Sequence, residues 1–277
     1  MDAYTDFMSD LATLDAAISR YVRPATFPLA IRMVTADEPI PARVRRPHRD
    51  LEVQVTICQA VGISRRYGWA VEVTPDDLSC PLVFVPFGFS APVAFQAEGH
   101  ACEGLYTETA EAGAISEQLV PRLEHGKYAG ILMAPLDRAE FEPQVVCVYG
   151  NSAQVMRLVQ ASLFSRGGAL NSLSTGRIDC SEIIIRTLLT QQPQYILPCS
   201  GDRIFGLTDD DEMIFAMPFD WSDEVIHGLE TTHAAGIRYP VPKFMRFSPQ
   251  YPPQYEKLRE ALVADSAAQN TSRHQKG

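Results

Sequence analysis

The chain has 277 residues, of which 46% are hydrophobic and 21% are charged, as in ordinary globular proteins. Its formal net charge of −10 argues against a general nucleic-acid binder, because such proteins need a basic surface to neutralise phosphates. The N-terminal residues lack the cationic start and apolar run of a secretory signal, and no apolar stretch reaches the roughly 18 residues that span a bilayer. We therefore expect a cytoplasmic protein that binds neither nucleic acid nor membranes.

The sequence of the N-terminal half predicts a helix, a strand and a second helix. Apolar residues recur at three- and four-residue steps within residues 1–22, which is the pattern of an amphipathic helix. Apolar residues alternate with smaller or polar ones over 27–33, which predicts a strand. A helix is expected over about 50–67, and Thr74 precedes a proline and two aspartates, as at a helix start. The prolines and glycines between Pro81 and Gly104 predict an irregular segment that could serve as a lid.

The C-terminal half predicts further strands and helices. Expected strands cover 128–135, 144–149, 195–197 and 212–217, and expected helices cover 152–163, 183–189, 223–232 and 253–263. Residues 264–277 are small and polar, so we expect a disordered tail there. These elements predict a single globular domain over residues 1–263, of the α/β or α+β class, with a mixed sheet and flanking helices.

Four of the six cysteines stand out because they lie among turn residues and helix starts. They form two widely spaced pairs, Cys58 with Cys80 and Cys180 with Cys199, whereas Cys147 lies in an apolar strand and is expected in the core. Thiolates are soft ligands and nucleophiles, and a reducing compartment disfavours a disulfide framework. The two pairs are therefore candidate ligands of one shared centre.

Four interpretations of these thiols remain open. Free cysteine is among the most buried residue types, so all six could be core residues. Four thiolates also suit an iron–sulfur cluster or tetrahedral zinc. The sequence has no local CxxC pair, which favours the cluster over zinc, since structural zinc usually folds a small unit around such pairs. The fourth interpretation is a metal-free nucleophile, with Cys180 as its best candidate because a helix start lowers the pKa of a thiol.

Several short segments together resemble one protein family. They are Phe27-Pro-Leu-Ala-Ile, Thr56-Ile-Cys-Gln-Ala, Thr74-Pro-Asp-Asp-Leu-Ser-Cys, Ala134-Pro-Leu, Val145-Val-Cys-Val-Tyr-Gly-Asn-Ser-Ala-Gln, Cys180 and Cys199-Ser-Gly-Asp-Arg. In this order and spacing they resemble the DUF169 family of bacterial and archaeal proteins, over about residues 27–260. The resemblance implies one shared architecture rather than a particular reaction. It also implies that the four paired cysteines are the recurring ones, whereas Cys102 and Cys147 are particular to this chain.

The leading hypothesis is a cytoplasmic iron–sulfur protein that acts on a small molecule in redox or lyase chemistry, with Cys58, Cys80, Cys180 and Cys199 as ligands. If one cysteine were not a ligand, the open iron could bind the substrate, and Arg203 and Gln154 would orient it. An electron donor and a second copy of the chain are considered as partners. The alternatives are a zinc–thiolate protein and a non-catalytic small-ligand-binding protein with buried thiols. The basic run over 43–49 is interpreted as solvated or salt-bridged rather than as an anion site.

Overall fold

The computed structural model describes residues 3–241 and 248–274, and in these residues six strands form one sheet in the order β2-β3-β1-β4-β6-β5. The strands are β1 (Leu29–Val34), β2 (Val71–Val73), β3 (Gly130–Pro135), β4 (Val145–Asn151), β5 (Gln194–Ile196) and β6 (Glu212–Pro218). All neighbouring strands are antiparallel. The α+β class is confirmed, but the sheet is antiparallel where a mixed one was expected. The reason is that β6 inserts between β4 and β5, so the strand–helix unit that starts at β4 creates no parallel pair.

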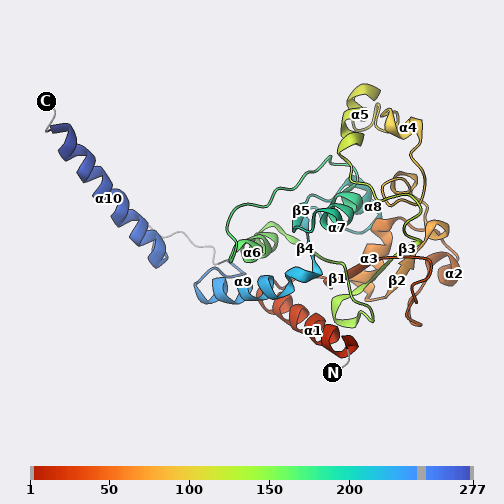
Figure 1. The fold of residues 1–277 in the computed structure, drawn as a ribbon, viewed down its shortest axis with the longest axis horizontal. Coiled ribbons are helices and arrows are strands. Elements are labelled where there is room, and N and C mark those ends of the chain that lie inside the picture. Colours follow the sequence, from red (N-terminus) through yellow and green to blue (C-terminus); the bar gives the residue numbers. More distant parts are fainter. Residues whose placement is uncertain (1–2, 242–247, 275–277) are drawn as a thin grey trace.

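Helices lie on both faces of this sheet (Figure 1). They are α1 (Ala3–Tyr21), α2 (Pro47–Leu51), α3 (Ile57–Tyr67), α4 (Ala94–Ala97), α5 (Ala110–Leu119), α6 (Ser152–Leu163), α7 (Arg186–Thr190), α8 (Ser200–Phe205), α9 (Ser222–Ala234) and α10 (Pro253–His274). Helices α1, α6 and α9 share one apolar core, and α3 belongs to the core on the opposite face. In β1, Ile31 faces the α3 core and Ala30 the other, because successive strand residues point to opposite faces. No helix of the described residues is long and apolar enough to cross a membrane.

Several elements differ from the sequence expectation in their bounds. The helix expected over 50–67 is divided into α2 and α3, because Glu52 adopts a left-handed conformation (φ 57°) at the end of α2. Strand β2 and helix α5 were not expected, and the turn predicted after Pro198 is helix α8. Helix α10 continues to His274, into residues expected to be disordered. This extension is rich in alanine, the strongest helix former. The single domain over 1–263 stays a prediction.

Candidate functional site

Cys58 lies in the first turn of α3, and local sequence fixes where that helix begins. The Thr56 side chain accepts a hydrogen bond from the Gln59 backbone N–H at 3.0 Å, and the Gln59 side chain accepts one from the Thr56 N–H at 2.9 Å. This reciprocal pair is a capping box, which satisfies two donors that a helix start otherwise leaves free. The cap places Cys58 on the buried side of α3, where only 9% of its surface is exposed.

The other three cysteines also precede or open helical segments. Cys199 directly precedes α8, and Cys180 directly precedes a π-helical turn over Ser181–Ile185 that leads into α7. Cys80 precedes a 3₁₀ turn over Pro81–Val83. Cys180 and Cys199 are buried and Cys80 is half-buried. All six cysteines are free thiols.

The structure brings the two cysteine pairs together. The Cys58 thiol lies close enough to the thiols of Cys180 and Cys199 for weak S–H···S contacts that change its pKa. Cys80 lies at the edge of this group, within electrostatic range of Cys180 and Cys199. We call these four residues the thiol cluster. By contrast, Cys147 is enclosed in the sheet on β4.

Every thiol of the cluster has a raised pKa. Contact with Cys180 and burial raise the pKa of Cys58 well above its usual range, and contact with Cys58 and burial do the same for Cys199. The contact with Cys58 lowers the pKa of Cys180, but burial and Asp179 outweigh it and raise that pKa to about 11. Burial raises the pKa of Cys80. The metal-free cluster therefore holds neutral thiols near pH 7, and Cys180 lacks the lowered pKa that marks a nucleophile.

Two buried aspartates adjoin the cluster. Asp179 and Asp202 are each 1% exposed, and their carboxyl groups lie within reach of each other. Burial and the neighbouring carboxylate raise the pKa of Asp179, which also contacts the Cys199 thiol. Burial raises the pKa of Asp202, although Thr208 and other neighbours oppose this. One oxygen of Asp179 and both oxygens of Asp202 lack a well-directed hydrogen bond among the described residues. The pair can hold a proton next to the thiols.

A fully buried arginine lies behind these acids. Arg65, 0% exposed, donates to both carboxylate oxygens of Glu212 at 2.8 and 2.9 Å. Its guanidinium carbon lies 4.0 Å from the centroid of the Tyr149 ring. Arg65 also acts electrostatically on Asp202 and opposes the rise of its pKa. The buried Arg65–Glu212 ion pair therefore lies next to Asp202.

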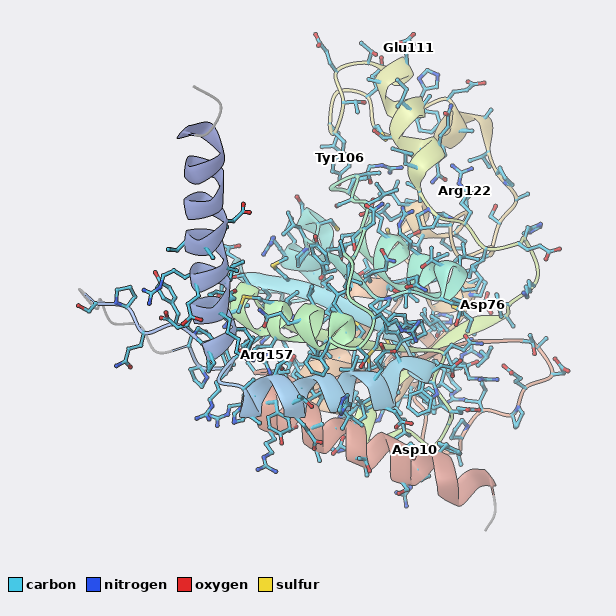
Figure 2. The ribbon with its side chains drawn as sticks, turned by 60° about the vertical axis from the view of Figure 1, so that its left-hand side comes forward. Asp10, Asp76, Tyr106, Glu111, Arg122 and Arg157 are labelled. Carbon is cyan, nitrogen blue, oxygen red and sulfur yellow. The ribbon has the colours of Figure 1, made fainter. Side chains whose placement is uncertain are left out.

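Tyr106, which follows the irregular segment predicted between Pro81 and Gly104, lies close to the thiol cluster. Figure 2 shows Tyr106 on the part of the chain that carries α4 and α5, residues 94–119, which we call the lobe. Burial and the nearby Cys199 raise the pKa of the Tyr106 hydroxyl, and Cys80 contributes to the same shift. Inside the lobe, Arg177 forms a buried ion pair with Glu117, whose Oε1 lies 3.9 Å from the Cys102 sulfur. Cys102 therefore packs within the lobe, apart from the cluster.

The two predicted substrate-orienting residues lie elsewhere. Gln154 caps α6: its side-chain oxygen accepts from the Asn151 N–H at 2.8 Å, and its NH₂ group donates to the carbonyls of Val22 and Arg23. Because α6 covers the sheet face opposite the thiol cluster, Gln154 is a structural residue. Arg203 donates to the Asp209 carbonyl at 2.7 Å, so its guanidinium is directed to the loop before β6.

Sequence reasoning missed Asp179, Arg65 and Tyr106. Asp179 carried a local signal, since it directly precedes Cys180 in a polar stretch. Arg65 carried no local signal, because its partner Glu212 lies 147 positions away.

The fold and the site define an α+β protein in which thiols and acids gather on one face of an antiparallel sheet. The model of the DUF169 family, described as "Uncharacterised ArCR", matches residues 17–228, and the chain belongs to this family. A relative, "Uncharacterized protein MJ0308" of Methanocaldococcus jannaschii, is 26% identical over 121 residues. That match covers 43% of this chain and 52% of the relative, about half its length. No solved structure matches the chain.

Proposed function

We propose that the thiol cluster binds an iron–sulfur cluster and that the protein uses it in redox or lyase chemistry on a small molecule in the cytoplasm. The observation that supports this proposal most is the meeting of Cys58, Cys180 and Cys199, with Cys80 beside them, from four separate segments of the chain. Sulfur donors are the usual ligands of iron–sulfur clusters. Soft thiolates at one point also suit zinc, which remains the alternative metal.

The donor set fits such a centre chemically, but the thiols must rearrange to hold it. In the part of the chain that the structure describes, no three His, Cys, Asp or Glu side chains already surround a common ligand position. Binding would also release protons, because the thiols are neutral and metals bind thiolates. A rotation about the Cα–Cβ bonds of the cysteines would change the sulfur positions without moving the helices.

An iron–sulfur cluster suits this arrangement better than structural zinc does. The ligands come from distant segments of an extensive core, whereas zinc usually organises small units through closely spaced cysteines. Cys80 differs from the other three in its partial exposure and its place at the edge. We infer that Cys80 is the most exchangeable ligand, and that a small molecule would approach the metal beside it and Tyr106.

The chain's own groups would then bind and orient that molecule at the exposed edge. Tyr106 is 38% exposed and its hydroxyl lies near Cys80 and Cys199. Its O–H group can both donate and accept a hydrogen bond. Gln154 and Arg203 have no part in this proposal, because their side chains are engaged elsewhere.

The test is metal and sulfide analysis of the full chain, purified without oxygen. Iron and acid-labile sulfide in similar amounts, with a brown colour, are expected. Stoichiometric zinc without sulfide would support the zinc–thiolate alternative. Protein that carries neither metal after anaerobic preparation and after reconstitution with iron and sulfide would contradict the proposal. That result would favour a non-catalytic ligand-binding protein with buried thiols.

A further inference from the structure

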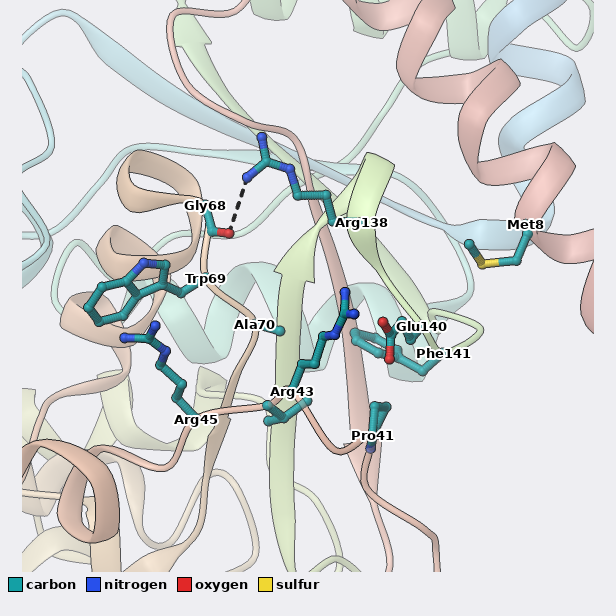
Figure 3. A pocket seen from close by; sticks show the side chains of 11 residues that line it. Met8, Pro41, Arg43, Arg45, Gly68, Trp69, Ala70, Arg138, Glu140 and Phe141 are labelled. Carbon is teal, nitrogen blue, oxygen red and sulfur yellow. Dashed lines mark hydrogen bonds between the residues drawn. The ribbon is translucent and has the colours of Figure 1, made fainter.

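A cavity rich in arginine lies apart from the thiol cluster, and none of the four cluster cysteines lines it. It has a volume of about 410 Å³ and opens between α1, the end of α3 and the segment after β3. Arg43, Arg45 and Arg138 line it together with a single acid, Glu140. Figure 3 shows Trp69 on one side of this cavity and Phe141 on the other. Three guanidinium groups thus gather around one cavity although the chain as a whole has a net charge of −10.

The basic run is divided between salt bridges and this cavity. Arg46 pairs with Asp77 at 3.0 Å and Arg49 with Asp50, so the salt-bridge interpretation is confirmed for these two arginines. Arg45 lies over the Trp69 ring, 3.7 Å from its centroid, and forms no ion pair with a described residue. Arg43 makes neither a hydrogen bond nor an ion pair within the described chain.

The third arginine of the cavity is held in place by its neighbours. Arg138 donates to the Gly68 carbonyl at 3.4 Å, as Figure 3 shows, and lies over the Phe27 ring at 4.5 Å. Its ion pair with Asp137, at 3.5 Å, is exposed and therefore weak. Stacking of Arg45 on Trp69 likewise orders that guanidinium before any ligand arrives, which reduces the entropy cost of binding.

We propose that this cavity binds an organic phosphate, a molecule with an apolar body and a phosphate or diphosphate group. Planar guanidinium groups form paired hydrogen bonds with phosphate oxygens. The volume lies within the range of small-molecule sites, and Trp69, Phe141 and Met8 provide apolar walls. Glu140 would repel the phosphate and limit its affinity. The proposal does not depend on the thiol cluster.

Binding is tested by the fluorescence of Trp69. The chain has two tryptophans, so the Trp221→Phe variant leaves Trp69 as the only reporter. The probes are ADP, adenosine and inorganic pyrophosphate in magnesium-free buffer, and calorimetry on the unmodified chain repeats the titrations. Arg43→Gln and Arg45→Gln are each expected to weaken ADP binding by about tenfold, since one charge-assisted hydrogen bond is lost. Glu140→Gln is expected to tighten it.

Arg259→Gln is the matched control, because it removes the same charge from an exposed position on α10. The proposal is supported if ADP binds more tightly than adenosine and only the cavity arginines affect its affinity. It is overturned if adenosine binds as well as ADP, if millimolar ADP does not bind, or if Arg259→Gln weakens binding as much as Arg43→Gln. Metal content of the thiol cluster should be the same in all these variants, so the two proposals can fail separately.

Discussion

Gly62 on α3 and Gly206 after α8 are in direct backbone contact. A Cβ atom at Gly62 would lie 2.8 Å from the Gly206 carbonyl oxygen, and one at Gly206 would lie 2.9 Å from the Cys58 oxygen. Gly206 has φ −87°, so close approach rather than backbone conformation requires glycine here. This contact sets the spacing of α3 and α8, and therefore of Cys58 and Cys199.

Replacement of Gly62 by alanine should separate the two helices. We expect the free energy of unfolding to fall by about 1–3 kcal/mol, as for other overpacked sites, and metal content to fall with it. Urea denaturation and metal analysis measure the two effects. Gly201→Ala on α8 is the control for the denaturation measurement only, since its Cβ would make an ordinary contact of 3.5 Å with the Cys199 sulfur. Equal stability of Gly62→Ala and the unmodified protein would show that the glycine contact does not set the spacing.

The buried Arg65–Glu212 pair should contribute far more to stability than a similar pair at the surface. Arg65→Met removes the closer, fully buried partner of Glu212 and leaves only Arg66, whose Nη2 lies 3.6 Å away, and breaking such a buried pair typically costs about 3–5 kcal/mol. Arg166 provides a close match, because it pairs with Glu224 and stacks on Trp221, but its side chain is 58% exposed. We expect Arg166→Met to cost only about 0–1 kcal/mol in the same denaturation experiment. Similar losses in both variants would contradict the assigned burial of Arg65.

Asp77 should make stability depend on pH in the acid range. Burial opposes its ionisation, but hydrogen bonds from Thr74, the His48 backbone and Arg46 outweigh this and lower its pKa. A carboxylate whose pKa is lower in the folded state than in the unfolded state stabilises the protein at pH values above its pKa in the unfolded state. That stabilisation is lost as the pH falls through its pKa in the folded state.

The difference in free energy of unfolding between the unmodified protein and Asp77→Asn should therefore be greatest near pH 7 and decrease below about pH 4. Urea midpoints at several pH values measure it, with the exposed neighbour variant Asp76→Asn as control. A difference that stays constant down to pH 2 would show that the charge of Asp77 is not what stabilises the fold.

Local sequence predicted much of the fold. Helices α1, α6 and α9 follow from apolar spacing, because each buries one regular face, and strands β1, β4 and β6 follow from short apolar runs, because they are buried on both faces. Helix α5 was missed, since it belongs to a lobe whose packing partner, the Gly99 turn, is not evident from periodicity. The sheet order also could not be predicted, because it depends on the pairing of distant strands.

The candidate site was predicted only in part. Turn chemistry separated the four paired cysteines from Cys147, and the structure places those four together. Gln154 was assigned to the substrate although Asn151 and Gln154 have the spacing of a capping box, a signal that the sequence did contain. Arg65 could not be assigned, since its role depends on a contact with Glu212 of β6, 147 positions along the chain.

The raised thiol pKa values predict slow alkylation of the metal-free protein. Because the thiolate is the reactive form, iodoacetamide should react slowly near pH 7 and faster as pH rises. Cys80 should be modified first because it is half-buried, and Cys147 only after unfolding because it is enclosed in the sheet. Peptide mass spectrometry follows each site. Rapid modification of Cys180 at neutral pH would instead favour the metal-free nucleophile.

The most direct test of the thiol cluster is the iron content of single cysteine-to-alanine variants, each prepared anaerobically and compared with the unmodified chain. Cys58→Ala, Cys180→Ala and Cys199→Ala are predicted to lose most of the iron, and Cys80→Ala to lose less. Cys102→Ala and Cys147→Ala, which lie outside the cluster, should retain it. Equal iron content in all six variants, or loss confined to Cys102→Ala or Cys147→Ala, would contradict a metal centre at these four thiols.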